Sequence, residues 1–492
     1  MHSRKAMKQK KINNITAILF AVAAAVLFCL KFSLSTSPFY GPGLHTHDSA
    51  IFFLIGKYWA EGSIPYIDLW DHKGPMIFFI NCLGCLIAGK HGVFALQCVF
   101  LSAFIFFTFK TFELRFNRWT SAGLSIVSLF WLACSYEGGN LTEEYVLPLL
   151  AASVYLTVRW LDDYRRTPCG HNPWNAVLLG AILAFCFLTR LTNGLGAAGA
   201  TLAIALILIK DRQWKNLLLN AAGFLGGALA LILPFAVYFA AKGALDECIF
   251  GSFLFNVSNL DAAEGGVGNN YWRANIIPFS IMAVNCFGLA VLSLFVLIRD
   301  KERRADAFVW LVSSLMLGWW LFTSSLMSHY RTVAVPFFPA LVIMLAGMKG
   351  RFLKASGLAV LALLIVGPVF LTLRKWSSFV DYFDRPEAVQ VAEELRGDIP
   401  PEDLPTTIIY GDPQFYLLLD IKPVYHNFTY PDGQGAKSER LRDDIVKEYS
   451  SCKASHILVS GGQVLIDGIL RDRYAFVKEY GADGDYKLYE RL

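Results

Sequence analysis

Long apolar stretches separated by short polar segments occupy the first three quarters of the chain. Residues 15–30, 216–241 and 352–373 contain almost no charged side chain. An apolar run of about 20 residues crosses the hydrocarbon core as a helix, because helices and closed barrels satisfy every backbone polar group in lipid. The pattern predicts a helical polytopic membrane protein with about eleven transmembrane helices, at 15–33, 92–112, 120–136, 145–161, 175–190, 193–210, 215–241, 274–298, 306–326, 332–348 and 353–373.

Basic residues between these stretches predict the orientation. With a cytoplasmic N-terminus, every inside loop carries a basic cluster, as the positive-inside rule requires. The apolar stretch 76–88 is too short to span and is predicted to be re-entrant or interfacial. The expected location is therefore the plasma membrane, with these segments outside: a first outer loop 34–92, a second outer loop 137–144, the loop 242–273, and everything after residue 374.

The last part of the chain is richer in charge. A helix is predicted over 386–396 from its apolar spacing, and short apolar runs predict buried strands at 406–410 and 456–460. Residues 422–428 and 486–492 are weaker strand candidates. The chain is therefore predicted to have two domains, a transmembrane catalytic domain (1–375) and a small C-terminal extracytoplasmic α/β domain (376–492).

Composition agrees with a membrane protein. Only 17% of the residues are charged and 55% are hydrophobic, whereas a soluble domain carries about 25% charged residues. The net charge of +5 is small and scattered, which argues against a nucleic-acid partner. Membrane lipids are the expected surroundings.

The first outer loop holds the densest group of reactive side chains. Asp48 opens a stretch with one apolar face, which is typical of a helix lying along the membrane surface. Asp68, Asp71, His72 and Lys73 follow near the end of the loop. Carboxylate and imidazole could bind a divalent metal ion, and the lysine could pair with a phosphate. The alternatives are that Asp48 only caps its helix and that the cluster is a solvated turn.

Further charged residues fall on the same predicted face. Glu143 and Glu144 belong to the second outer loop, where they could act in chemistry or only favour a helix start. Arg190 and Arg331 lie at the outer ends of helices and could bind an anionic headgroup, or extend to lipid headgroups as a structural feature. His329 is interpreted as an interfacial residue.

Carboxylates from two outer loops and arginines from two helix ends thus meet on one face. A glycosyl transfer needs a base that takes a proton from the acceptor hydroxyl and cations that hold the leaving phosphate. This combination predicts a glycosyltransferase.

The segments Asp48 with its apolar helix, Glu61–Asp68 (Glu-Gly-Ser-Ile-Pro-Tyr-Ile-Asp) and His72–Pro75 (His-Lys-Gly-Pro) resemble the first outer loop of GT-C-fold membrane glycosyltransferases. More narrowly, these segments resemble the bacterial branch related to protein O-mannosyltransferases and aminoarabinose transferases, glycosyltransferase families 39 and 83. Glu137–Pro148 is similar to their second acidic loop, and His329–Pro339 to their late helix.

The resemblance implies an inverting transfer of a hexosyl or pentosyl group from a polyprenyl-phosphate sugar donor to an acceptor glycan, lipid or protein on the outer face. Asp48 would be the general base, Glu143 or Glu144 would assist or bind metal, and Lys73 with Arg331 would contact the lipid phosphate. This chain departs from the family pattern at His72, where relatives carry an acid.

Two other functions fit a polytopic chain. A transporter or flippase of a lipid-linked saccharide would place polar residues near the membrane centre and often show inverted repeats, and neither feature is evident in the sequence. A non-catalytic receptor or scaffold leaves the acidic first loop unexplained.

Overall fold

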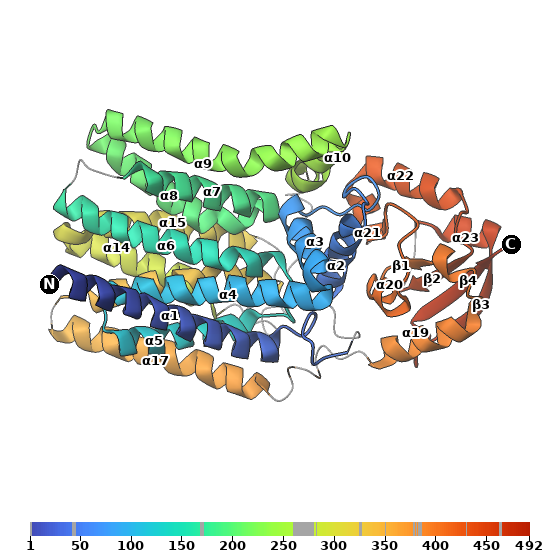
Figure 1. Ribbon diagram of the computed structural model, residues 1–492, viewed down its shortest axis with the longest axis horizontal. Coiled ribbons are helices and arrows are strands. Elements are labelled where there is room, and N and C mark those ends of the chain that lie inside the picture. Colours follow the sequence, from blue (N-terminus) through green and yellow to red (C-terminus); the bar gives the residue numbers. More distant parts are fainter. Residues whose placement is uncertain are drawn as a thin grey trace.

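The computed structural model describes residues 2–41, 46–167, 172–258, 280–281, 283–323, 327–349, 351–376, 379, 381, 386–429, 431–461 and 465–492. Long helices form a bundle, and a small sheet domain lies beyond one end of it (Figure 1). The bundle helices are α1 His2–Phe32, α4 Lys90–Glu113, α5 Arg118–Ser135, α6 Thr142–Arg166, α7 Pro173–Thr189, α8 Leu195–Lys210, α9 Trp214–Ala241, α14 Leu289–Arg299, α15 Arg304–Thr323, α16 Phe338–Ala346 and α17 Arg351–Trp376.

The apolar stretches predicted from the sequence are helical wherever the structure describes them. Seven helical segments in the described residues are long and apolar enough to cross a membrane by length and composition. Some predicted segments lie partly outside the described residues. These are the loop 242–273 from residue 259 on, the span 274–298 at 274–279 and 282, and the span 306–326 at 324–326. The predicted fold class, a helical polytopic membrane protein with a small α/β part, is confirmed.

Two short helices, α2 (His47–Ala60) and α3 (Pro75–Ala88), lie between the bundle and the sheet domain (Figure 1). The Thr46 hydroxyl caps α2 by accepting a hydrogen bond from Ser49 N at 3.3 Å. Helix α3 has 14 residues and begins at Pro75, whose fixed φ suits a first helical position. It ends where Gly89 takes a positive φ of 58°. The predicted short apolar helix at 76–88 is therefore confirmed as a helix of about that length, while its re-entrant or interfacial position stays a prediction.

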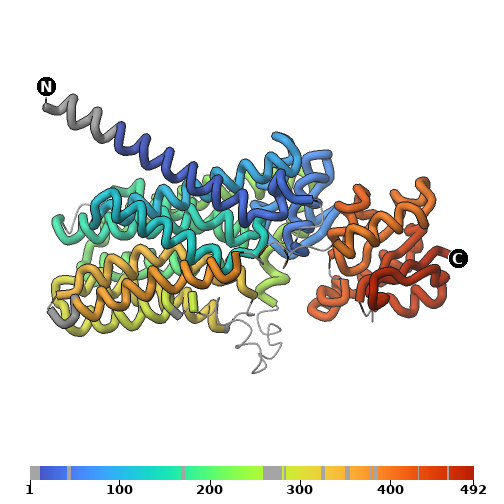
Figure 2. Tube along the Cα trace, turned by 90° about the horizontal axis from the view of Figure 1, so that it is seen from below, coloured from blue at the N-terminus to red at the C-terminus, as the bar shows by residue number. Residues whose placement is uncertain are grey.

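The C-terminal part is built on a four-stranded sheet in the order β1-β2-β4-β3. Strands β1 and β2 are parallel, and the other two pairs are antiparallel. Figure 2 shows this part from below, at the end of the molecule away from the N-terminus. Its elements are α19 Pro386–Asp398, β1 Ile408–Tyr410, α20 Gln414–Leu419, α21 Pro431–Lys437, α22 Glu439–Ser450, β2 His456–Ser460, α23 Asp467–Arg473, β3 Tyr474–Tyr480 and β4 Tyr486–Arg491.

The predicted helix at 386–396 and the predicted strands at 406–410, 456–460 and 486–492 are confirmed within two residues. Strand β3 was not predicted, because adjacent Phe476 and Val477 are both exposed and a bulge interrupts any alternation.

The predicted strand at 422–428 is wrong. This segment is irregular, because its backbone groups bond to side chains and to the first outer loop instead of to a neighbouring strand. The Glu448 carboxylate accepts hydrogen bonds from His426 N and, at 3.1 Å, from Asn427 N. The His426 carbonyl accepts one from Trp70 N at 3.1 Å.

Helices α2 and α3 approach closely at Gly56. A Cβ at this position would lie 2.4 Å from Asn81 Cβ and 2.7 Å from the Asn81 carbonyl carbon. We expect Gly56→Ala to push the helices apart and to lower the free energy of unfolding by about 1–3 kcal/mol, the usual effect of overpacking. Thermal unfolding in detergent measures this.

Gly123→Ala is the matched control, because the Gly123 position in α5 has open space around it. Alanine there should leave the melting temperature unchanged or raise it through helix propensity. Equal melting temperatures for Gly56→Ala and wild type would contradict the close packing of α2 on α3.

Candidate active site

The end of the first outer loop is held firmly at the bundle. The buried Tyr66 hydroxyl donates to the Lys73 carbonyl at 2.7 Å. Gly74 N donates to the Thr189 carbonyl at 3.1 Å. A Cβ on Gly74 would lie 2.0 Å from the Leu188 carbonyl oxygen, so only glycine permits this contact with the end of α7. The backbone around Lys73 is therefore fixed on both sides.

The predicted cluster of Asp71, His72 and Lys73 is compact and mostly buried. Lys73 Nζ lies 2.9 Å from His72 Nε2, and Asp71 Oδ1 accepts a hydrogen bond from Lys73 N at 3.0 Å. Burial, and then the charge of Lys73, lower the pKa of His72 well below its ordinary value. His72 is therefore neutral, its Nε2 accepts from the ammonium, and its proton lies on Nδ1, 3.6 Å from Asp71 Oδ2.

Asp48 and Asp71, in the same loop, have opposite electrostatic surroundings. Burial tends to raise the pKa of Asp48, but Lys73, His329, His47 and His72 oppose it and lower the pKa to about 2. Burial raises the pKa of Asp71 to about 6, with Asp48 adding to the effect and Lys73 opposing it. Asp48, half-buried at the start of α2, thus stays ionised down to a much lower pH than Asp71, which takes up its proton near pH 6.

Glu143 at the start of α6 and Arg190 at the end of α7 form an ion pair. Arg190 Nη1 donates to Glu143 Oε1 at 2.8 Å, and the guanidinium lies 3.7 Å from the centre of the Tyr330 ring. Thr142 Oγ1 donates to the other Glu143 oxygen at 2.8 Å. Both charged side chains are largely buried, so removing either one would leave the other as an uncompensated buried charge.

Glu144 faces away from this group. Its carboxylate accepts hydrogen bonds from Tyr136 OH at 2.5 Å, Asn140 N at 2.7 Å and Gln97 Nε2 at 2.9 Å. Asn140 in turn bonds to Asn81 of α3 at 2.9 Å. Glu144 therefore joins the second outer loop to α4 and α3, and the structure distinguishes the two second-loop acids.

The segment 328–337, a 3₁₀ helix, carries His329 and Arg331, which the sequence pointed to, and Tyr330, which it did not. His329 Nδ1 lies 2.6 Å from Glu137 Oε2, and its charge acts on Asp48. Tyr330 stacks with Arg190. In the sequence, the tripeptide His-Tyr-Arg at a helix end is the pattern that could have pointed to Tyr330. Arg331 is fully buried, and its Nη1 donates to the Met327 carbonyl at 3.0 Å.

Among the described residues, Asp71 and His72 are not joined by a third metal-binding side chain. The described part of the chain contains no group of three or more His, Cys, Asp and Glu side chains placed to share an ion. Asp71 and His72 offer two donors, but the Lys73 ammonium lies 2.9 Å from His72 Nε2 and competes for that lone pair. We therefore assign no metal-dependent step to Asp71 and His72.

The C-terminal domain contacts the first outer loop next to this cluster. The backbone carbonyl of His426 accepts a hydrogen bond from Trp70 N. The ring Nδ1 of His426 lies 2.8 Å from the Ile67 carbonyl oxygen. Lys57 of α2 pairs with Asp420 at 2.8 Å. Arg440 bonds to Glu247. Trp70, directly before Asp71, is completely buried in this contact, so the domain orients the loop that carries the cluster.

No protein-family model and no curated protein sequence matches the chain. Several solved structures match the chain. ArnT from Cupriavidus metallidurans bound to undecaprenyl phosphate matches over 97% of this chain and 98% of its own, with 11% identity and a TM-score of 0.57. An Archaeoglobus fulgidus oligosaccharyltransferase in complex with Zn and sulfate matches over 89% and 68%, with 12% identity and a TM-score of 0.53.

These solved proteins are an aminoarabinose transferase and an oligosaccharyltransferase, both membrane glycosyltransferases of the GT-C fold. The chain has this fold over nearly its whole length. The resemblance seen in its loop sequences is therefore confirmed at the level of fold, while sequence identity this low carries no residue assignment.

The raised pKa of Asp71 predicts a pH-dependent stability. Because the folded state holds this proton more tightly than the ordinary value of 3.8 allows, stability falls as pH rises from about 4 to about 6. At pH 7 the charged group destabilises the fold by up to about 3 kcal/mol. Asp71→Asn should therefore unfold at higher temperature than wild type at pH 7, and this difference should disappear near pH 4.

Thermal unfolding in detergent at both pH values measures this. Asp68→Asn, the same change at an exposed position of the same loop, is the control and should not show this gain. A gain from Asp71→Asn that is equal at pH 4 and pH 7 would contradict a buried, destabilised Asp71 carboxylate.

Proposed function

We propose that this chain is a glycosyltransferase that moves a sugar from a polyprenyl-phosphate donor to an acceptor hydroxyl on the face that carries the C-terminal domain. The observation that carries the proposal is Asp48, a half-buried carboxylate whose pKa is held at about 2, against the effect of burial, chiefly by Lys73 and His329. A base and its surrounding cations are the two components that such a transfer needs. The GT-C fold supports the same conclusion.

The cations provide a place for the donor phosphate. Lys73 lies in the fixed loop, and Arg190 is oriented by Glu143 and Tyr330. In a partly desolvated site these charges stabilise the phosphate that leaves with the lipid. Arg331 is a neighbouring candidate for the same role, which its position two residues after His329 supports.

Donor binding also tunes the base. The bound phosphate would partly neutralise the cations that lower the pKa of Asp48. Their effect on Asp48 is then weaker, so the basicity of Asp48 rises when the donor is present. Asp48 takes the proton of the acceptor hydroxyl as its oxygen attacks the anomeric carbon. The bond from that carbon to the phosphate oxygen breaks, and polyprenyl phosphate leaves with both bonding electrons. Attack opposite the leaving group inverts the anomeric configuration.

Asp48→Asn tests the base directly. We expect transfer to fall by about 10²–10⁴-fold, the usual contribution of general base catalysis, while the variant still binds the donor. Purified protein in detergent is supplied with a panel of polyprenyl-phosphate sugars, and released polyprenyl phosphate and glycosylated acceptor are measured by mass spectrometry.

Glu61→Gln is the control, because Glu61 is an exposed carboxylate at the other end of the same helix. It should retain wild-type transfer. Full activity in Asp48→Asn would remove the proposed mechanism. Movement of a lipid-linked sugar between leaflets by wild type in vesicles, without release of polyprenyl phosphate, would instead identify a flippase.

Lys73→Gln tests the phosphate site. We expect binding of undecaprenyl phosphate to weaken by about tenfold or more, because a desolvated charge pair contributes more than an exposed one. Lys242→Gln is the matched control, an exposed lysine at the same end of the bundle. Equal weakening by both substitutions would show that overall charge, not Lys73, holds the lipid phosphate.

A further inference from the structure

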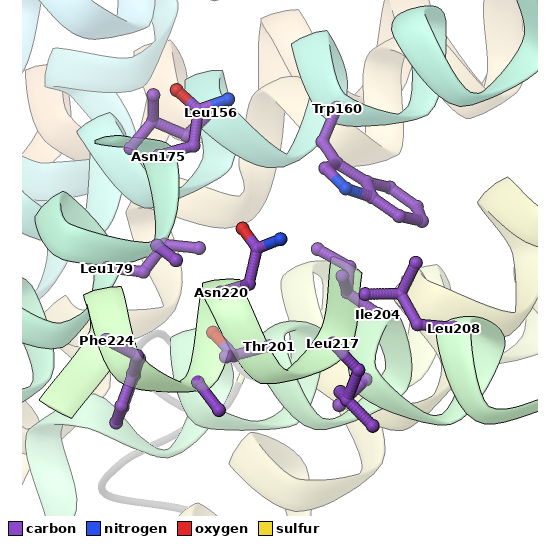
Figure 3. A pocket seen from close by; sticks show the side chains of 13 residues that line it. Leu156, Trp160, Asn175, Leu179, Thr201, Ile204, Leu208, Leu217, Asn220 and Phe224 are labelled. Atoms are coloured by element: carbon purple, nitrogen blue, oxygen red, sulfur yellow. The ribbon is translucent and has the colours of Figure 1, made fainter. Parts of the chain in front are cut away.

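A cavity lies within the bundle, at the end away from the candidate active site. Its volume is about 230 Å³, and it is lined by residues of α6, α7, α8 and α9. Figure 3 shows Trp160, Asn175 and Asn220 around it, with apolar side chains making up most of the remaining wall. Leu217 and Asn220 in the wall are only half-buried, so the cavity extends to the surface of the bundle.

The packing of α9 explains why this space exists. Helix α9 is pressed against α7, since a Cβ on Gly227 would lie 1.9 Å from the Val177 carbonyl oxygen and one on Gly180 would lie 1.9 Å from that of Phe224. Toward α6 and α8, by contrast, small side chains such as Ala176, Ala205 and Ala221 line the gap. The helices meet closely on one side and leave an apolar hollow on the other.

Aromatic side chains mark the depth of the cavity. Trp174 and Trp214 are 70% and 56% exposed at the starts of α7 and α9, and exposed tryptophans on spanning helices mark the membrane interface. The wall runs along α9 from Leu217 to Phe224. Phe224 therefore lies about 15 Å below Trp214, which is about the hydrocarbon depth of one leaflet.

The turn above the cavity is basic. Lys210, Arg212 and Lys215 are all exposed there, next to the wall residues Leu208 and Leu217. The one acid of the turn, Asp211, accepts a hydrogen bond from Tyr164 OH at 2.5 Å. The turn thus presents a net positive charge at the headgroup level.

We propose that this cavity binds one acyl chain of an anionic phospholipid from the leaflet at this end, with the lipid phosphate against Lys210, Arg212 and Lys215. An apolar hollow at this depth excludes water, and an acyl chain is the apolar material that surrounds it. Asn175, at the level of Trp174, offers an amide where the ester groups of the lipid lie. The bound lipid would fill the space between α9 and α6–α8 and hold α9 in place. This proposal does not depend on the proposed sugar transfer.

Native mass spectrometry of the delipidated full chain in detergent tests the site, with dioleoyl phosphatidylglycerol or dioleoyl phosphatidylcholine added. We expect one phosphatidylglycerol to be retained about tenfold better than phosphatidylcholine, as several basic residues near a lipid surface provide. Ala221→Trp, which fills the cavity, should reduce this retention about tenfold. Leu218→Trp is the matched control, because Leu218 is 69% exposed on the same helix outside the cavity.

A second pair of variants keeps the test decisive if Ala221→Trp fails to fold. Ala205→Leu adds less bulk from α8 and should also reduce retention. Combined Lys210→Gln, Arg212→Gln and Lys215→Gln should remove the preference for phosphatidylglycerol while the lipid chain still binds.

Three results would overturn the proposal. They are equal retention by Leu218→Trp and the cavity-filling variants, equal retention of the two phospholipids by wild type, and replacement of bound phosphatidylglycerol by an equal amount of undecaprenyl phosphate.

Discussion

One buried ammonium, that of Lys73, governs the electrostatics of the candidate active site. It keeps Asp48 ionised, holds His72 neutral by donating to Nε2 at 2.9 Å, and partly offsets the burial of Asp71. A cation at the edge of an apolar bundle is expensive to desolvate, so it must have carboxylates and an acceptor nearby. The same requirement pairs Arg190, at the end of α7, with Glu143, at the start of α6.

The position of Lys73 depends in turn on contacts far apart in the chain. Tyr66 and the end of α7 fix its backbone, and the C-terminal domain holds Trp70 through His426. Glu448 uses its carboxylate to shape the segment that makes this contact. The sheet domain is therefore part of the support for the site, although it contributes none of the residues in the central cluster.

The GT-C fold persists here at 11–12% identity to solved structures of that fold. Helix packing in a membrane accepts many apolar sequences, provided that length and hydropathy are kept. Close contacts are more demanding, as Gly56 against Asn81 and Gly74 against Leu188 show. Such glycines set the position of the first outer loop without appearing as a motif.

The sequence alone determined the helical membrane class, the short helix α3, most strands of the sheet, and the two loops that hold Asp48, Lys73 and Glu143, because hydropathy and charge are local properties. It did not predict that 422–428 is irregular or that β3 exists, since those backbone groups are satisfied by partners distant in sequence. Only the tertiary structure decided that Glu143, not Glu144, meets Arg190. Two adjacent carboxylates look alike in a sequence, but a helix turns successive side chains about 100° apart and sends them to different neighbours.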